Sequence, residues 1–106
     1  MLNVIKYSLQ GRSRLWSRMR SQFLKLSPTC TACDSDRGLE VHHIRPFHLH
    51  PELELEASNL VTLCKYCHLV IGHLRDYTYY NVSVLEDCQK FKDKRREFKD
   101  GGENRD

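Results

Sequence analysis

Apolar positions recur along the chain with two different periods, and each period predicts a kind of element. Residues 13–26 carry apolar side chains at helical spacing, which predicts an amphipathic helix; the positions are Leu15, Trp16, Met19, Phe23 and Leu26. Pro28 would stop this helix just past its last apolar position. Trp16 is predicted to be a core residue rather than a platform on which a nucleobase stacks.

Two short runs later in the chain are typical of strands. In LEVHHI the residues Leu39, Val41 and His43 alternate onto one face, and NLVTLC is a second apolar run. Residues 65–76 predict a short helix directly after the second run. The stretch 45–58 has two prolines and three glutamates but no period, which predicts a loop.

A last amphipathic helix is expected over residues 84–99, with Leu85, Cys88, Phe91 and Phe98 on its apolar side. Together these elements predict one small α+β domain over residues 1–106, with its core at about residues 22–75. A chain of 106 residues can bury only a modest core, so a metal or disulfides are expected to add stability.

Charge is small overall but unevenly spread. The net charge is +3, yet residues 1–33 carry six Lys/Arg side chains and no acid. Segregation of this kind predicts a polyanion partner, with a solvated helix face as the plain alternative. Arg14 and Arg18 lie on the basic side of the first predicted helix, so they are candidates for phosphate contacts.

The sequence shows no membrane or secretory signal. No apolar run approaches the roughly 20 residues of a membrane span, and the N-terminal run is too short for a cleavable secretory signal. We therefore expect an intracellular protein with no membrane partner. Cysteines in such a compartment tend to stay reduced and to bind metal.

Four of the five cysteines form two CxxC pairs, Cys30/Cys33 and Cys64/Cys67. A CxxC turn points two thiolates at one position, and two such turns complete a tetrahedral zinc site with no open position. Such a site is structural and contributes folding free energy. A redox CxxC, disulfides and an iron–sulfur centre are the alternatives. The fifth cysteine, Cys88, is expected to be a small core residue.

Four of the six histidines crowd into residues 39–50, and two of them, His42 and His43, are adjacent. A zinc ion held by both cysteine pairs would bring their strand next to the second strand and to His68, which directly follows Cys67. Histidines from distant segments are then expected near one point. Because neighbours on a strand face opposite sides, His42 and His43 should have distinct roles.

The segments LEVHHIRPF, ASNLVTLC and CKYCH present a His–His pair, an asparagine and a further histidine in order. This set resembles the HNH nuclease family over about residues 22–75. The spacing is similar too, since Asn59 lies 16 residues after His43 and His68 lies 9 after Asn59. The resemblance implies a ββα-metal (His-Me finger) core around one divalent metal, with a four-cysteine zinc ribbon and flanking helices.

The resemblance also implies roles for individual residues. His43 would be the general base that deprotonates water, a task that suits a neutral imidazole. His42 and His68 would hold the divalent metal, and Asn59 would orient His43 or approach the metal. Imidazole ligands shift the preference from Mg²⁺ towards Mn²⁺, Ni²⁺ or Zn²⁺. Arg45, just after the strand, is another candidate for phosphate contact.

Three other histidines have less defined roles. Colicin-type members carry a histidine four residues after the helix ligand, where this chain has Gly72, followed by His73. At about 100° per residue, His73 should point away from His68 unless Gly72 distorts the turn. His73 is thus either a ligand or a helix-end residue with a local hydrogen bond. His48 and His50 are expected to be exposed loop residues.

The predicted function is a metal-dependent endonuclease that acts on nucleic acid, foremost DNA, and cuts one strand at each active site. Double-strand cutting would need a homodimer or two events. Similar members include phage and bacterial nucleases, so the expected location is the cytoplasm, or the host cytoplasm for a phage protein. The rival hypothesis is a non-catalytic zinc-ribbon module that binds nucleic acid. A third is a zinc-stabilised protein-interaction module.

Overall fold

The structure is a computed structural model that describes the backbone of residues 13–103 and the side chains of residues 13–97. The ends of the expected 1–106 domain therefore lie outside the described residues. Within the described part, no helix combines the length and hydropathy that crossing a membrane would require.

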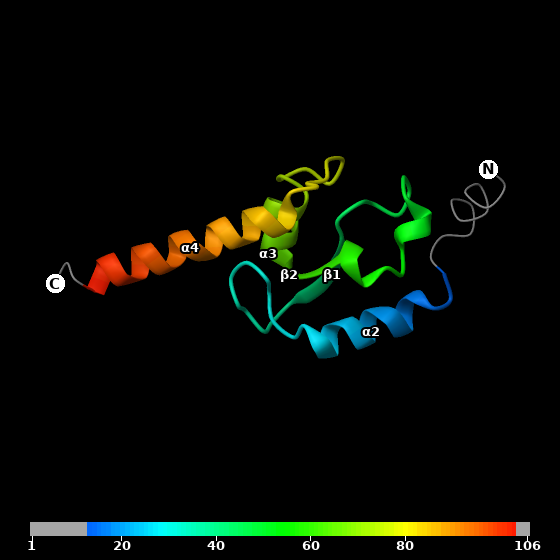
Figure 1. The fold of residues 1–106 in the computed structure, drawn as a ribbon, viewed down its shortest axis with the longest axis horizontal. Helices are drawn as coiled ribbons and strands as arrows, with labels where there is room; N and C mark the ends of the chain where they lie inside the picture. The colour runs from blue at the N-terminus through cyan, green and yellow to red at the C-terminus, as the bar shows by residue number, and fades with distance from the viewer. Residues whose placement is uncertain (1–12, 104–106) are drawn as a thin grey trace.

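Two short antiparallel strands form the centre of the fold (Figure 1). Strand β1 (Leu39–His43) pairs with β2 (Leu60–Cys64), and the register places Leu39 opposite Cys64 and His43 opposite Leu60. Both strands agree with the sequence prediction. Their pairing brings the start of β1 next to the second cysteine pair, so the sheet connects the cysteines at one end to the histidines at the other.

A short helical segment follows β2 directly and completes a strand–strand–helix unit. Helix α3 (Lys65–Cys67) continues into η3 (His68–Gly72), which is a π-helix rather than an α-helix. The loop between the strands contains two 3₁₀ turns, η1 (Pro51–Leu53) and η2 (Ala57–Asn59). The predicted α+β class, with a small ββα core, is confirmed.

Helix α2 (Trp16–Leu26) packs beside β1 with its apolar side half-buried. It begins three residues later than the predicted start at residue 13, because Ser13 and its neighbours form a turn in which the Ser13 carbonyl accepts from Trp16 N–H. Leu15, just before the helix, and Leu26, at its end, are exposed, so their assignment to the apolar face was wrong.

Helix α4 (Val84–Glu103) starts in the core and then extends away from the rest of the fold (Figure 1). Val84 and Cys88, one turn apart, are the buried residues among its described side chains. Of the predicted apolar side, Cys88 is buried, Leu85 and Phe91 are exposed, and Phe98 lies outside the described side chains. The helix also continues past the predicted end at residue 99, through two glycines that each cost only about 1 kcal/mol.

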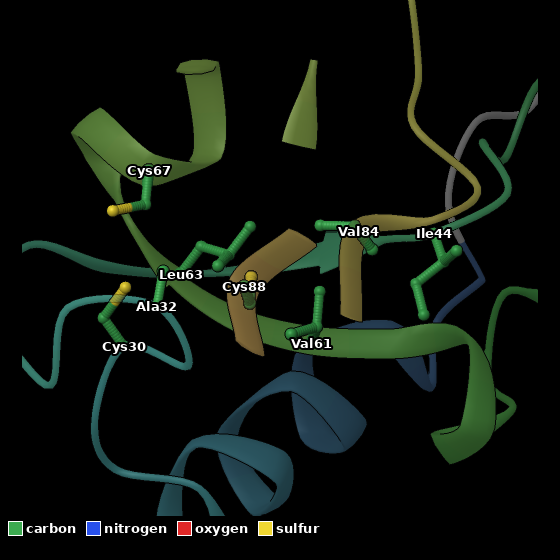
Figure 2. Close-up of a cluster of buried hydrophobic side chains, with 8 residues drawn as sticks. All are labelled: Cys30, Ala32, Ile44, Val61, Leu63, Cys67, Val84 and Cys88. Carbon is green, nitrogen blue, oxygen red and sulfur yellow. The ribbon is translucent and has the colours of Figure 1, made fainter. Parts of the chain in front are cut away.

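The core is a small cluster that joins α4, β2 and the first cysteine pair (Figure 2). Val84 and Cys88 of α4 pack against Val61 and Leu63 of β2, next to the turn that holds Cys30. Arg95 of α4 donates to the Cys33 carbonyl at 2.7 Å, and Lys92 pairs with Asp34 at 3.1 Å. Helix α4 therefore holds the cysteine turn through its buried side chains and through these two polar contacts.

Candidate metal centre and active site

Strand β1 presents its two histidines to opposite sides of the sheet. Both side chains are buried, at 2% exposure for His42 and 7% for His43. The His42 ring packs against His68 and His73, with ring centroids 4.8 and 4.9 Å away. The His43 ring instead packs against Trp16 of α2, with centroids 4.5 Å apart. The alternation of the strand thus separates the two imidazoles into two environments, as expected.

Three imidazoles converge on one side of β1. His42, His68 and His73 each offer a ring nitrogen, and these nitrogens all lie within 4.8 Å of one another. The structure therefore brings together the two histidines that the sequence pairs as metal ligands. It also places His73 in this cluster, so of the two alternatives left open for His73 the position of a ligand is the one that the structure favours.

The reason for the different position of His73 is the π-helix. In η3 the backbone N–H of His73 donates to the carbonyl of His68 at 3.0 Å, which is the i+5 to i bond of a π-turn. This wider turn returns residue 73 to the side of residue 68, where an α-helix would place residue 72. Gly72 itself packs against the imidazoles, and a Cβ on it would lie only 3.3 Å from His42 Nε2.

Hydrogen bonds fix the tautomers of two rings in the cluster. His68 Nδ1 lies 2.9 Å from Glu40 Oε1, and His73 Nδ1 lies 2.8 Å from the Tyr79 carbonyl oxygen. Carboxylate and carbonyl oxygens only accept, so both Nδ1 atoms donate and both Nε2 atoms carry lone pairs. Those two Nε2 atoms are 3.2 Å apart, a distance at which facing lone pairs repel unless a cation lies between them.

His42 supplies the third acceptor. Its Nε2 is buried and has no hydrogen-bond partner among the described residues. Burial, followed by the neighbouring imidazoles, lowers its pKa to about 3, so the ring is neutral at ordinary pH. A neutral imidazole is the form that binds a metal. Three convergent imidazoles fit a divalent ion with an open coordination position. Two of them are oriented by hydrogen bonds from their Nδ1 atoms, on the side of the ring away from the ion.

The surroundings of His43 fit a different task. Its Nε2 lies 2.9 Å from the backbone carbonyl oxygen of Glu54. Since the carbonyl only accepts, Nε2 carries the proton and Nδ1 is the basic atom of the ring. Glu54 itself is held by its buried carboxylate, which accepts from Ser13 N–H at 3.0 Å. The loop and the start of α2 together hold the imidazole in one orientation.

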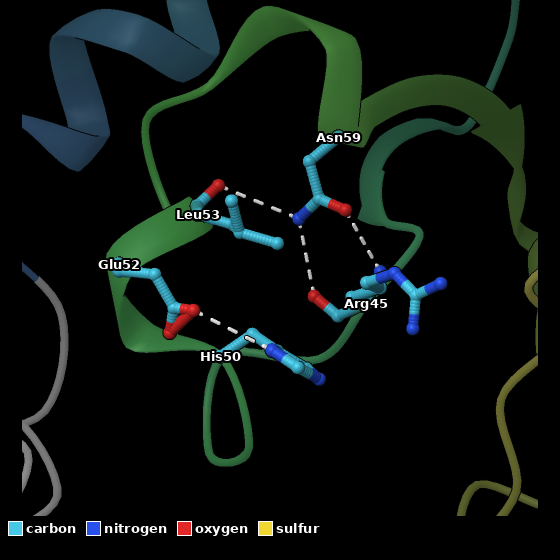
Figure 3. A network of polar contacts seen from close by, with 5 residues as sticks. All are labelled: Arg45, His50, Glu52, Leu53 and Asn59. Carbon is cyan, nitrogen blue, oxygen red and sulfur yellow. Dashed lines mark hydrogen bonds and ion pairs between the residues drawn. The ribbon is translucent and has the colours of Figure 1, made fainter.

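Asn59 is buried and bonds to the backbone of the loop (Figure 3). Its Oδ1 accepts from Arg45 N–H at 2.9 Å, while its Nδ2 donates to the carbonyls of Arg45 at 3.1 Å and Leu53 at 3.4 Å. These bonds clamp the residues after His43 to the residue before Glu54. Among the described contacts, Asn59 therefore reaches His43 through the backbone, and none joins it to the three-imidazole cluster.

The four cysteines of the CxxC pairs gather at the other end of the sheet, and we call them the four-cysteine cluster. Their sulfur atoms all lie within 4.8 Å of one another, and Cys33 Sγ is 3.7 Å from Cys64 Sγ. A disulfide needs about 2.05 Å, whereas zinc–sulfur bonds of about 2.3 Å give a tetrahedral edge of roughly 3.8 Å. The cluster fits structural zinc. Cys88 stays apart in the core, where burial raises its thiol pKa to about 11.

Comparison with known families gives a match over part of the chain. Residues 30–73 match the family model described as HNH endonuclease. Searches of curated proteins and of solved structures find no match to this chain. The matched HNH segment begins at Cys30 and ends at His73, so it contains both the four sulfur atoms and the three imidazoles.

The described residues form a cleft of about 310 Å³ over the histidines. His42, His43, His68 and His73 all line it, so the three-imidazole cluster and His43 open into the same space. His48 lines it as well. His50 does not, and pairs with Glu52 at 3.4 Å (Figure 3). The exposed position expected for His48 is confirmed, whereas His50 is only half-exposed.

The predicted phosphate contacts lie outside the three-imidazole cluster. Arg14 and Arg18 are exposed, Arg14 in the turn before α2 and Arg18 on the helix itself. Arg45 is also exposed, although its backbone is fixed by Asn59. Each guanidinium is thus accessible to a polyanion.

Sequence reasoning missed several residues that shape the candidate site. Glu40 holds His68, and Tyr79 holds His73 through its carbonyl oxygen. Glu40 had a readable signal, because it lies two residues before His42 and alternation puts both on one face. Tyr79 had no such signal, because its contact with His73 uses the backbone carbonyl, which every residue type carries.

Removing the carboxylate behind His68 is expected to weaken metal binding at the three imidazoles. Glu40→Ala should lower Ni²⁺ affinity by about 10–100-fold, because the ring loses the partner that fixes its tautomer and direction. Glu40→Gln, which still offers a carbonyl oxygen, should lose less. Calorimetric titration of the zinc-loaded protein measures the affinity. Glu52→Gln is the matched control, and an equal loss there would contradict the role of Glu40.

Proposed function

We propose that this protein is a metal-dependent endonuclease that hydrolyses DNA phosphodiester bonds, one strand at each active site. The supporting observation is the shared cleft, in which three converging imidazole acceptors lie beside His43, a separate and oriented imidazole. The HNH domain indicates nuclease-type chemistry. The choice of DNA rests on that family and on the exposed arginines.

His43 is the proposed general base. Its Nε2 proton is committed to the Glu54 carbonyl, so Nδ1 accepts the proton of the attacking water. The Trp16 ring restricts rotation of the imidazole and shields one of its faces. After attack the proton resides on Nδ1, and the imidazolium keeps its Nε2 bond to the carbonyl.

His42, His68 and His73 would hold the divalent ion. When bound there, such an ion would polarise the scissile phosphate and stabilise charge on the departing 3′ oxygen. The three imidazoles favour Mn²⁺, Ni²⁺ or Zn²⁺ over Mg²⁺. The four-cysteine cluster would hold a separate structural zinc that fixes the end of β2 and, through α3, the position of His68.

Asn59 is proposed as a positioning residue. It keeps the segment just after His43 and the residue before Glu54 at a fixed separation, so the Glu54 carbonyl stays within reach of Nε2. Arg14, Arg18 and Arg45 are proposed to contact backbone phosphates, which gives salt-dependent and sequence-independent binding. We treat residues 1–106 as one nuclease domain, so double-strand cutting needs a second copy or a second event.

Plasmid nicking with different ions tests this function. Wild-type protein should nick supercoiled DNA with Mn²⁺, Ni²⁺ or Zn²⁺ and less well with Mg²⁺. His42→Ala should need at least about tenfold more ion for the same rate, because one of three ligands is lost. Circular dichroism on both proteins shows that the fold is retained.

Absence of nicking with every ion, combined with salt-dependent DNA binding, would indicate the non-catalytic binding module instead. Absence of both would leave the protein-interaction module. Nicking that does not respond to His42→Ala would contradict the assigned metal ligands.

A further inference from the structure

The cleft has a wall that the proposed chemistry does not use. Tyr77, Tyr79 and Tyr80 line it from one segment, and Phe47 lines it from the loop after β1. The site therefore combines nitrogen ligands at its base with aromatic rings along its sides. In a nuclease cleft, rings of this kind cannot neutralise phosphate, so they are suited to another part of the nucleotide.

Two of these tyrosines contribute little to the core. Tyr77 is 63% exposed and Tyr79 is 59% exposed. Exposed apolar surface that gathers at a groove often marks a binding site for a ligand. Their neighbours in the cleft are the histidines, so any molecule that covers these rings also approaches the three-imidazole cluster.

The backbone that carries the tyrosines is fixed at both ends. Thr78 donates to the Asp76 carboxylate from its N–H at 2.9 Å and its hydroxyl at 2.7 Å. Asn81 donates from its backbone to the Gly72 carbonyl at 3.1 Å and from its side chain to Asp87 at 2.7 Å. A segment held in this way loses little conformational freedom when a ligand stacks on it.

The wall is also joined to the imidazoles. The Tyr79 carbonyl accepts from His73 Nδ1, and the Tyr77 ring centroid lies 4.9 Å from that of His73 and 6.2 Å from that of His68. A base that stacks on Tyr77 would therefore belong to a nucleotide next to the phosphate that reaches the cluster.

Stacking on such a wall requires a base with an open face. Within a duplex both faces of a base are covered by its neighbours, whereas an unpaired base can leave the stack. Base–aromatic stacking is the recurrent means by which proteins bind single strands without sequence preference. A site built only for duplex phosphate would have no use for these rings.

We propose that Tyr77 and Tyr79 form a stacking wall for an unpaired base beside the scissile phosphate. The preferred substrate is then DNA that is single-stranded or locally unpaired at the cut. This inference rests on the proposed nuclease function for the position of the phosphate, and its binding test is independent of cleavage.

Fluorescence anisotropy on the zinc-loaded full chain tests the wall. All proteins carry His43→Ala, so cutting cannot interfere, and the probes are a labelled oligothymidine strand and a blunt duplex of equal length. Tyr77→Ala should weaken strand binding by about tenfold and leave duplex binding unchanged. Tyr77→Phe keeps the ring and should bind like the parent. Tyr66→Ala removes a tyrosine that is 64% exposed but does not line the cleft, and should also bind like the parent.

Equal losses for strand and duplex, or no loss with Tyr77→Ala, would overturn the wall. Cleavage assays separate this failure from that of the nuclease proposal. If proteins with an intact His43 cut duplex and single strand equally, with or without Tyr77, the function stands and this inference fails. If nothing is cut but strand binding still depends on Tyr77, the wall stands and the function fails.

Discussion

Cys67→Ser is expected to unfold the protein at neutral pH. Cys67 is buried, and its sulfur lies in the four-cysteine cluster that joins the turn at Cys30 to the end of β2. Structural zinc contributes about 10–16 kcal/mol of apparent binding free energy in small domains. A domain of this size has only about 5–15 kcal/mol of total stability, so loss of the ion exceeds what the small core supplies.

The measurement is zinc content after dialysis together with far-ultraviolet circular dichroism. Cys88→Ala is the matched control, because it removes a buried sulfur outside the cluster and should keep both the zinc and the fold. Chelation of the wild-type protein should reproduce the Cys67→Ser spectrum. A folded Cys67→Ser protein with a full complement of zinc would show that the four-cysteine cluster is not the stabilising site.

His43→Ala is expected to lower the nicking rate by about 10²–10⁴-fold while leaving ion affinity unchanged. The reason is geometric, since the His43 ring contacts Trp16 and the Glu54 carbonyl and is not a member of the three-imidazole cluster. Removing the base should therefore abolish proton transfer without disturbing the ligands. Single-turnover nicking and Ni²⁺ titration on the same preparation measure the two effects.

His50→Ala serves as the control, because this histidine pairs with Glu52 outside the cleft. It should nick like the wild type. A His43→Ala protein that loses Ni²⁺ affinity in parallel with activity would instead place His43 among the metal ligands. A variant that keeps full activity would remove it from the mechanism.

The sequence was sufficient to predict the framework of the fold. Alternation in LEVHHI and the run NLVTLC predicted both strands, because a strand in a small sheet is a local pattern. The paired CxxC spacing predicted the four-cysteine cluster, because each turn fixes two ligands by itself. Antiparallel pairing then brought His42 close to His68, as expected from the cysteines alone.

Other features depend on geometry that residue type does not record. His73 was expected to point away because an α-helical period was assumed, and a π-turn replaces that period. The apolar spacing of α4 predicted that Leu85 and Phe91 would pack against the core, but both side chains are exposed. Trp16 was expected in the core, and its half-buried ring instead packs against His43.

The spacing of five residues between His68 and His73 matters for sequence patterns that are used to recognise proteins with this cluster. A π-turn absorbs one additional residue without changing the direction in which the next side chain leaves the helix. A gene could therefore gain a codon between two ligand positions and still encode a usable cluster. Search patterns that insist on a spacing of four would reject these proteins, whereas a pattern that tolerates either spacing, with glycine just before the second histidine, would retain them.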